Sequence, residues 1–537
     1  MRLNFKKGFS RQNFNGKTMS QNLSEQEIGR RESLQKIREM GINPYPPERF
    51  DVTAFAADIK ENYQEEILDD GTKNRLNYYE VTIAGRMMAQ REAGKAMFMN
   101  LQDSTGLIQL YLRAEELNEG AGREDFFAVL VKKLLDIGDY IGIKGFAFKT
   151  KTGEVSVHVK ELTLLSKALR PLPVVKKDAE GNVFDAFTDP EQRYRQRYVD
   201  LTVNPQFREI FIKRTKLIKT MRDYLDELGL MEVETPILQP IHGGAAARPF
   251  KTHHNTLDMP LFLRIANELY LKRLIVAGFD GVYEFGKMFR NEGMDRTHNP
   301  EFTALEFYVA YKDYNWMMDV TEVMLAKVAM ALQGKTQVKV GENEIEFGGK
   351  YTRLTMYEAI EKYSGIDLSQ STEGDLKDYC RKNHIEVDAT MGWAKLIDEI
   401  FGAKAEKNLI QPTFITDYPV EMSPLTKKHR TKEGLVERFE LFVNGKEVAN
   451  AYTELNDPIE QRERFEEQLR LAERGDEEAM MMDDDFVRSL EYGMPPTAGI
   501  GFGIDRLTML FTGQVSIQEV LFFPQMKAEK TAQIIQE

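Results

Sequence analysis

Cysteine is the scarcest functional residue of this sequence, because Cys380 is the only one among 537 residues. A single cysteine excludes an intramolecular disulfide and any zinc site built from several cysteines, and it suits a reducing, cytoplasmic compartment. The seven histidines never take the H-x-x-x-H spacing of a helical metal site. No uninterrupted apolar run is long enough to span a bilayer, so no membrane span is expected.

Basic residues are also fewer than acidic ones: the chain has 72 Lys and Arg and 85 Asp and Glu, which gives a net charge of −13. This balance argues against nucleic-acid binding through overall charge, although it does not exclude a local basic patch. Residues 1–18 depart from it, with basic side chains, no acidic one, and no apolar core of a secretory signal. We expect a disordered extension there; a nucleic-acid-binding arm is the alternative.

The chain is long enough for two or three domains. Residues 19–72 are predicted to hold a charged N-terminal helix, capped by Ser24, and a linker. Short strands punctuated by glycine, with one helical piece between the third and fourth strands, fill residues 73–165. Five such strands are typical of an OB-fold β-barrel, a fold that binds oligonucleotides.

A second domain of different character is expected after a Pro-bearing linker at residues 166–200. Residues 201–528 begin with a long amphipathic helix and continue with antiparallel hairpins and helices, without a regular βαβ rhythm. The pattern predicts an α+β domain with an antiparallel sheet flanked by helices. The polar tail, residues 529–537, is expected to fray.

The stretch FRNEGMDRTHNPEFTALEF, residues 289–307, carries more charge than a connecting loop needs. If the flanking segments are antiparallel strands, alternation places Phe302, Glu306 and Tyr308 on one face. Arg290 then stands at the mouth of the loop, where an arginine can hold a phosphate through two parallel hydrogen bonds. The pattern favours a nucleotide site built on strands. The alternative is a solvated hairpin tip above a buried glutamate whose hydrogen bonds are satisfied.

Several motifs in family order resemble the class II aminoacyl-tRNA synthetases. FRNEGMDRTHNPEF resembles motif 2, GIGFGIDRLTML resembles motif 3, and RTKLIKTMRDYLDELGLMEVETPIL, ending in Pro236, resembles motif 1. Further stretches, among them GRMMAQREAGKAMF, RYRQRYVDL, GGAAARPF and ELYLKRL, are similar to the bacterial-type lysyl-tRNA synthetases over roughly residues 24–528. The resemblance implies ATP-dependent attachment of L-lysine to the 3′ end of tRNA(Lys) through a lysyl-adenylate.

The segment RFELFVNGKEVANAYTEL has the form of a β-hairpin, because the Asn-Gly pair at 444–445 favours a type I′ turn. Simple pairing sets Phe442 opposite Glu447 and Glu440 opposite Ala449. The two glutamates are then diagonal neighbours on one face and can bind Mg²⁺ together with ATP phosphates. The resemblance assigns the same pair to two or three Mg²⁺ ions. Two exposed strand glutamates without a metal are the alternative.

The resemblance also implies a lysine pocket. Its residues are Gly244, Glu268, Arg290, Glu306, Tyr308, Asn450, Tyr452 and Glu454. By family pattern Glu306 and Tyr308 receive the ε-ammonium, Glu268 the α-ammonium, and Arg290 the carboxylate or the α-phosphate. Simple alternation would put Asn450, Tyr452 and Glu454 on the face opposite Glu447, so a bulge is predicted near Val448–Ala449.

The ATP site implied by the resemblance shares Arg290 with this pocket. Its residues are Arg290, Glu292, His298, Asn299, Phe302, Glu447 and Arg506. The family pattern gives Glu292 the adenine amino group, Phe302 the stacking face, His298 the outer phosphates, and Arg506 the other adenine face or the γ-phosphate. Arg290 and Arg506 are the expected catalytic residues, because an already ionised carboxylate needs charge neutralisation rather than a general base. For the transfer step His298 is a candidate base, with a phosphate role as the favoured reading.

The barrel is expected to read the anticodon. Phe98 and Gln109 match a stacking aromatic and a base-reading amide of this subgroup, and Arg86 can add a phosphate or base contact. For Phe98 a place in the barrel core is the alternative. A homodimer without membrane association is expected from the class. Rival readings are an enzyme that lysylates a protein, an inactive RNA-binding paralogue, and an aspartyl or asparaginyl synthetase.

Overall fold

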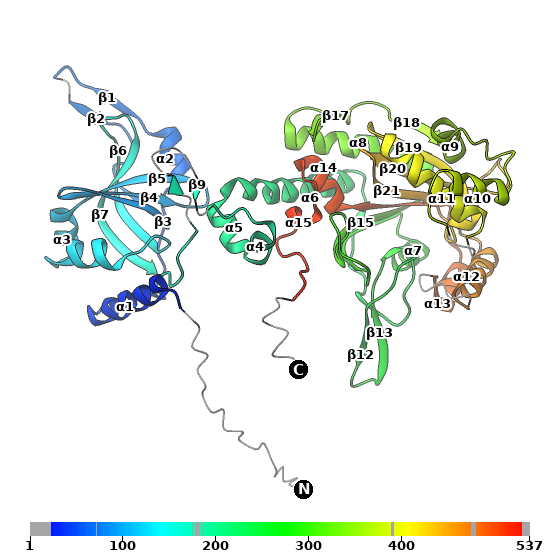
Figure 1. Cartoon of the computed structure of the whole chain (residues 1–537), viewed down its shortest axis with the longest axis horizontal. Helices are drawn as coiled ribbons and strands as arrows, with labels where there is room; N and C mark the ends of the chain where they lie inside the picture. Colours follow the sequence, from blue (N-terminus) through cyan, green and yellow to red (C-terminus); the bar gives the residue numbers. More distant parts are fainter. Residues whose placement is uncertain are drawn as a thin grey trace, which may run out of the picture. The chain divides into compact units, whose positions relative to one another are not determined.

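The computed structural model describes most of the chain, and the predicted N-terminal extension at 1–18 and tail at 529–537 lie outside the described residues. The described ranges are 23–70, 72–173, 176–177, 183–184, 186–387, 391–473 and 479–528. The chain divides into two compact units, Met1–Phe187 and Thr188–Glu537, each described by itself below (Figure 1). No helix in the described ranges is long and apolar enough to cross a membrane.

A closed five-stranded barrel forms the first unit. Its strands, in spatial order, are β3 (Val81–Ala93), β4 (Ala96–Gln102), β5 (Leu107–Arg113), β7 (Val155–Ser166) and β6 (Tyr140–Lys149). Alternate residues of each strand are buried, as the period-2 pattern requires, and they meet in one apolar core. The predicted OB-fold barrel is therefore confirmed.

Helices and a small hairpin surround the barrel. They are α1 (Glu25–Glu39), α2 (Ala56–Asn62), β1 (Glu65–Ile67), β2 (Lys73–Arg75), α3 (Ala114–Ala121) and a π-helix at Phe126–Leu134. Ser24 caps α1 as predicted, in a reciprocal capping box with Glu27. Two short paired strands follow the barrel, β8 (Lys176–Lys177) and β9 (Val183–Phe184).

An eight-stranded sheet is the frame of the second unit, and its inner neighbours all pair antiparallel. Its strands, in spatial order, are β10 (Met231–Glu232), β14 (Gly281–Phe289), β15 (Glu301–Ala310), β22 (Thr497–Gly503), β21 (Lys446–Thr453), β20 (Leu435–Val443), β19 (Thr413–Pro419) and β18 (Thr352–Thr355). Only the outermost pairs, β10–β14 and β18–β19, are parallel. The antiparallel sheet predicted from the hairpin pattern is confirmed.

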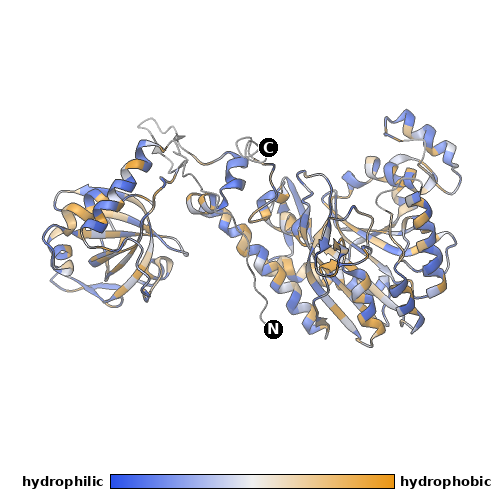
Figure 2. Cartoon of the chain, turned by 90° about the horizontal axis from the view of Figure 1, so that it is seen from below, coloured by the Kyte–Doolittle hydropathy of each residue, from blue (hydrophilic) through white to orange (hydrophobic). Residues whose placement is uncertain are grey.

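The two faces of this sheet differ. One face is apolar and packs against α6 (Arg208–Glu227), α8 (Tyr314–Gln333) and α14 (Ile504–Thr512). Leu305 and Phe307 of β15 belong to that core, so the alternate residues Glu306 and Tyr308 project from the other face. That second face meets α7 (Glu268–Val276) and α13 (Asp484–Glu491). Figure 2 shows helices of this unit with alternating apolar and polar segments, as amphipathic helices on a sheet require.

The remaining elements of the second unit lie around this frame. They are α4 (Pro190–Arg195), α5 (Arg197–Val203), β11 (Leu238–Gln239), β12 (Lys251–His254), β13 (Met259–Leu263), β16 (Gln337–Val340), β17 (Asn343–Glu346), α9 (Met356–Ser364), α10 (Glu373–Lys382), α11 (Trp393–Lys404), α12 (Pro458–Glu473) and α15 (Ile517–Val520). The motif 1 stretch does not end in one continuous strand, because β10 and β11 pair with strands of two different sheets.

Candidate functional site

The charged hairpin predicted from the sequence is formed by β14 and β15, whose register pairs Glu284 with Glu306 and Phe289 with Glu301. Arg290 follows β14 directly, and its guanidinium carbon lies 5.2 Å from the centre of the Phe302 ring. An aromatic ring and a guanidinium group thus lie at the end of the hairpin, on the strand face that also carries Glu306.

A row of residues crosses five strands on the same face of the sheet. Glu284 of β14 pairs with Glu306 of β15, which pairs with Gly501 of β22, then Asn450 of β21, then Glu440 of β20. Directly opposed residues project to the same side of a sheet. Residues far apart in the sequence therefore share one surface, with a glycine at its middle.

The next row holds Tyr308, Gly499, Tyr452 and Arg438 in the same strand order. A Cβ atom at Gly499 would lie 2.2 Å from Oε1 of Glu454 and 2.3 Å from Cε1 of Tyr308. Only glycine fits under these two side chains. The first two glycines of GIGFG, Gly499 and Gly501, thus form the floor of the site.

The hairpin between β20 and β21 turns at Asn444 and Gly445, which both have positive φ, 52° and 68°, as a type I′ turn requires. The register shifts at Val448, so Phe442 faces Glu447 and Leu441 faces Ala449. The predicted bulge is confirmed. The prediction that Glu440 lies opposite Ala449 is wrong, because the extra residue moves Asn450 opposite Glu440. The bulge places Glu447, Glu440 and Asn450 on one face.

Three carboxylates of the predicted lysine pocket are buried close together: Glu268 is 4%, Glu306 9% and Glu454 1% exposed. Burial, with the nearby charge of Glu268 second, raises the pKa of Glu306 to about 8. Burial also holds the pKa of Glu454 well above its ordinary value. The Tyr308 hydroxyl donates to Oε2 of Glu306 at 2.9 Å. The group thus brings three carboxyl groups together in a desolvated space, where a bound cation would favour their ionised forms.

A fully buried cation that the sequence reasoning did not single out lies among these acids. Lys272 Nζ is 2.6 Å from Oε1 of Glu268 and also forms an ion pair with Oε2 of Glu454. The i,i+4 spacing of Glu268 and Lys272 in ELYLKRL was the available signal. Nearby, Arg264 Nη1 donates to Oε1 of Glu284 at 2.6 Å, which balances that fourth acid.

Glycine is also required beside Glu268, at Gly244. Its φ is +86°, and a Cβ atom there would lie 3.0 Å from Cβ of Ala266 and 3.2 Å from Cβ of Glu268. Asn267 donates its side-chain amide to Oε2 of Glu284 at 3.1 Å. The close backbone at Gly244 and the hydrogen bond of Asn267 thus hold Glu268 in place at the start of α7.

Arg438 connects the predicted metal ligand to the pocket, and the sequence reasoning missed it as well. Its Nε donates to Oδ1 of Asn450 at 3.1 Å, its Nη1 to Oγ of Ser423 at 2.9 Å, and its Nη2 to Oε1 of Glu440 at 2.5 Å. Burial raises the pKa of Glu440 to about 7 against the opposing charge of Arg438, and the charge of Glu447 adds to the rise.

The other predicted ATP residues gather around Arg506, on the first turn of α14. Arg506 Nη1 donates to Oε2 of Glu447 at 3.2 Å, and its Nη2 lies 3.3 Å from Nε2 of His298. His298 Nδ1 lies 2.8 Å from Oδ2 of Asp295. Burial lowers the pKa of Arg290, while the charges of Glu292 and Glu447 raise it and that of Arg506 lowers it further. Glu447 therefore interacts with both arginines, as a hydrogen-bond partner of Arg506 and as a nearby charge for Arg290.

Of the other predicted ATP residues, Asn299 is hydrogen-bonded within the protein and Glu292 is exposed. The Asn299 side chain donates to the backbone oxygen of Glu301 at 2.5 Å and accepts from the backbone of Gln525 at 3.2 Å. Glu292 is exposed at the loop.

Glu440 and Glu447 supply oxygen ligands of the kind that Mg²⁺ accepts. No cluster of three or more His, Cys, Asp or Glu suited to a metal occurs among the residues that the structure places.

In the barrel unit, Phe98 lies on β4 between the buried Met97 and Met99 and is itself half-buried, so it is outside the barrel core. Its ring centre is 5.2 Å from that of Tyr111 on β5. Two residues away on β5, Gln109 accepts a hydrogen bond from Oγ of Ser156 at 3.1 Å. These side chains make a mixed aromatic and polar surface on the outside of the barrel.

Arg86 belongs to a different contact of the barrel. Its Nη1 donates to the backbone oxygen of Gly138 at 2.8 Å and its Nη2 to the hydroxyl of Tyr140 at 3.1 Å. The guanidinium carbon also lies 4.2 Å from the centre of the Tyr140 ring. The structure thus brings Phe98 and Gln109 together on β4 and β5 and holds Arg86 against β6.

Comparisons with known proteins match both units. Residues 189–527 match the family described as tRNA synthetases class II (D, K and N), and residues 81–165 match the OB-fold nucleic acid binding domain family. A lysine–tRNA ligase of Porphyromonas gingivalis is 62% identical over 95% of this chain and 87% of its own length. The chain belongs to the lysine–tRNA ligases of the class II tRNA synthetases.

Other lysine–tRNA ligases are similar over nearly the whole chain. The protein of Christiangramia forsetii is 61% identical over 96% of this chain and 88% of its own. That of Azobacteroides pseudotrichonymphae is 56% identical over 95% of this chain and 99% of its own. The family resemblance drawn from the motifs is thereby confirmed, for the catalytic unit and for the barrel together.

Proposed function

We propose that the chain attaches L-lysine to the 3′ end of tRNA(Lys), with ATP, through a lysyl-adenylate. The single observation that carries this proposal is the set of three buried carboxylates, Glu268 of α7, Glu306 of β15 and Glu454 after β21, together with Arg290 at the end of β14. An amino acid with two ammonium groups and one carboxylate has the complementary charges. Membership of the lysine–tRNA ligases gives the same answer independently.

Within the pocket, Glu306 and Tyr308 receive the ε-ammonium, and their mutual hydrogen bond prepares them for one ligand group. Glu268 receives the α-ammonium, with the backbone at Gly244 close beside it. Tyr452 and Glu454 complete the pocket. Aspartate or asparagine has no ε-ammonium group and would leave the buried Glu306 without a cation, which is costly in a desolvated site.

The first step is attack by the lysine carboxylate on the α-phosphorus of ATP, which releases pyrophosphate. The nucleophile is already ionised, so the protein's contribution is orientation and charge neutralisation by Arg290 and Arg506. Phe302, already under the Arg290 guanidinium, offers the stacking face for adenine. Glu292, Asn299 and His298 complete the nucleotide contacts.

Mg²⁺ is proposed at Glu440 and Glu447. Two carboxylates from neighbouring strands fit this hard cation, which keeps several waters and shares phosphate oxygens as ligands. Bound there, it would supply positive charge to the triphosphate. The protein's own part is to hold the two carboxylates, through Arg438 at Glu440 and Arg506 at Glu447.

The domain roles are proposed along the boundaries expected from the sequence, with residues 73–165 reading the anticodon and residues 201–528 performing both chemical steps. Phe98 stacks on a base, Gln109 reads a base edge, and Arg86 adds a contact. In the second step the tRNA 3′-hydroxyl takes the lysyl group from the adenylate. The cytoplasm, where translation substrates meet, is the proposed location.

A homodimer is proposed from the surface near the motif 1 segment. Ile212 on α6 is 59%, Met231 51% and Leu238 49% exposed. Large exposed apolar side chains on elements in or next to the motif 1 stretch are of the kind that a second copy covers.

Exchange of labelled pyrophosphate into ATP tests the first step. We expect exchange with lysine and none above background with aspartate or asparagine, in the absence of tRNA. Charging of tRNA(Lys) then tests the second step and separates a tRNA ligase from a protein-lysylating enzyme. Exchange that depends on aspartate or asparagine instead of lysine would refute the proposal.

A further inference from the structure

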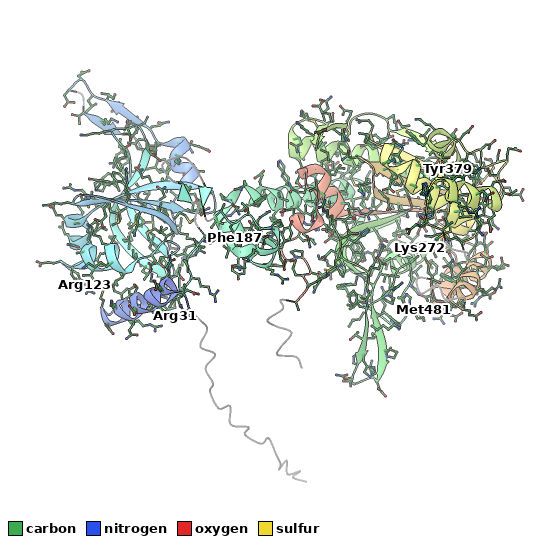
Figure 3. All side chains as sticks on the ribbon, in the orientation of Figure 1. Arg31, Arg123, Phe187, Lys272, Tyr379 and Met481 are labelled. Carbon is green, nitrogen blue, oxygen red and sulfur yellow. The ribbon has the colours of Figure 1, made fainter. Side chains whose placement is uncertain are left out.

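Lys272 is a fully buried cation in direct contact with the proposed lysine pocket, and it has no role in the mechanism above. It is 0% exposed, and its ammonium group forms ion pairs with Glu268 and Glu454. Figure 3 labels it in the second unit. A buried lysine is costly unless it is paired, so its retention here needs a physical reason.

Position on α7 explains how the side chain reaches both acids. Glu268 and Lys272 are four residues apart and lie on the same face of the helix, while Glu454 follows β21. The ammonium lies 5.6 Å from the Tyr452 ring centre and 5.7 Å from that of Phe486 on α13. Aromatic rings therefore flank the ammonium group, and the Lys272 side chain is fully buried.

The other charged groups around α7 are balanced or face the ligand. From β14, Glu284 is paired with Arg264. From α13, Asp483 accepts two hydrogen bonds from Arg273 at 2.8 and 2.9 Å. The groups left to interact with the Lys272 ammonium are Glu268, Glu454, Glu306 with its partner Tyr308, and Tyr452.

The charges of the pocket groups match those of the substrate. When all three carboxylates are ionised in the complex, their three negative charges equal the positive charges of Lys272 and of the two ammonium groups of bound lysine. Without Lys272 the pocket would hold three buried carboxylates, and like charges so close share protons instead of all ionising.

We propose that Lys272 is a positioning and specificity-determining residue of the lysine pocket: it fixes one oxygen each of Glu268 and Glu454, and its charge favours the ionised form of Glu454. This inference rests on the proposed function, because it concerns the same pocket. One oxygen of each carboxylate remains for the substrate's ammonium groups. Lys272 interacts with Glu268, Glu454, Tyr452 and Phe486, none of which is proposed to bind ATP.

The test compares Lys272→Met with the wild type in lysine-dependent pyrophosphate exchange between about pH 6.5 and pH 9. At pH 7 we expect the KM for lysine to rise roughly 30- to 100-fold in the variant, because a carboxylate without its cation takes up a proton. The ratio of variant to wild-type KM should fall by up to about tenfold per pH unit as the proton is lost. The kcat should change only a few-fold.

Two further variants separate charge from packing. Lys272→Arg keeps the charge and should keep the wild-type pH profile. Lys167→Met is a matched control in the barrel unit, where Lys167 is likewise buried and paired with Asp136 and Asp139. It should lower the stability of that unit and leave the KM for lysine unchanged.

Each outcome is decisive. A KM ratio for Lys272→Met that does not depend on pH, or an unchanged KM, overturns the inference. If the Met variant does not fold, Lys272→Gln replaces it with the same expectation, since its amide can donate to both carboxylates without charge. Wild-type enzyme without lysine-dependent exchange would instead refute the proposed function itself.

Discussion

Replacing Gly499 by alanine is the smallest change that should damage the amino-acid pocket. Gly499 lies on β22 between Tyr308 of β15 and Tyr452 of β21. An added Cβ would lie 2.2 Å from Glu454 Oε1 and 2.3 Å from Tyr308 Cε1. Favourable contacts between carbon atoms lie at about 3.5–4.0 Å, so both neighbours must move by more than about 1 Å.

The size of the effect follows from how little these neighbours can move. Tyr308 is 3% and Glu454 1% exposed, and each is held by a partner, Glu306 and Lys272 respectively. Overpacking of a well-packed core costs about 1–3 kcal/mol. Displacement of binding groups by about 1 Å can cost about 100-fold in rate. We therefore expect the unfolding free energy to fall by about 1–3 kcal/mol and the kcat/KM for lysine to fall by about 100-fold.

Gly501→Ala is the matched control on the same strand and the same face. A Cβ there would meet Cγ of Glu306 at 3.5 Å, an ordinary contact. Because its φ is not positive, alanine should be neutral or stabilise the fold by up to about 1 kcal/mol. Urea unfolding measures both stabilities, and pyrophosphate exchange at varied lysine and varied ATP measures the two Michaelis constants.

The decisive comparison is between the two variants. Gly499→Ala should raise the KM for lysine far more than the KM for ATP, since the clash lies under the lysine pocket. Equal stability and equal KM for lysine in the two alanine variants would mean that Tyr308 and Glu454 do not occupy these positions in the active enzyme. The proposed structure of the lysine pocket would then be wrong.

Three further predictions address pH, metal and tRNA. Burial raises the pKa of Glu306 to about 8 from 4.5, so the stabilising contribution of its proton is lost as pH rises through the pKa of the folded state. Urea unfolding without lysine should therefore show the unfolding free energy falling between about pH 6 and pH 8, by at most about 1.4 kcal/mol per pH unit. Glu306→Gln should remove this fall. Glu447→Gln should raise the Mg²⁺ concentration needed for ATP binding, measured by calorimetry, by at least about tenfold; an unchanged Mg²⁺ titration would contradict the assignment. Phe98→Ala should raise the KM for tRNA by about 5- to 150-fold, equivalent to about 1–3 kcal/mol of stacking, and leave pyrophosphate exchange unchanged.

Local sequence rules predicted much of the frame of the site. Strand alternation placed Phe302, Glu306 and Tyr308 on one face, and the Asn-Gly pair at 444–445 predicted the turn, both as the structure has them. The bulge near Val448 was predicted only by combining alternation with the family pattern. Each of these features depends on neighbours in sequence or on one hairpin, which is why sequence sufficed.

Features that depend on the order of strands could not be read from the sequence. Gly499 is next to Tyr308 and Tyr452 only because β22 lies between β15 and β21, and no local pattern specifies that order. Lys272 and Arg438 were missed for a related reason. A charged residue on an amphipathic helix or strand is usually solvated, and only tertiary contacts show that these two are held by acids inside the protein.

The sheet also explains how amino acid and nucleotide can be handled together. Glu306, Gly501, Asn450 and Glu440 form one continuous row across four strands, so the proposed lysine and metal groups have fixed spacing set by strand separation. Arg438 strengthens the link, because one guanidinium group binds both Asn450 and Glu440. A site built on strands in this way is stiffer than one built on loops, and attack on an α-phosphorus gains from that stiffness because its catalysis depends on position and charge.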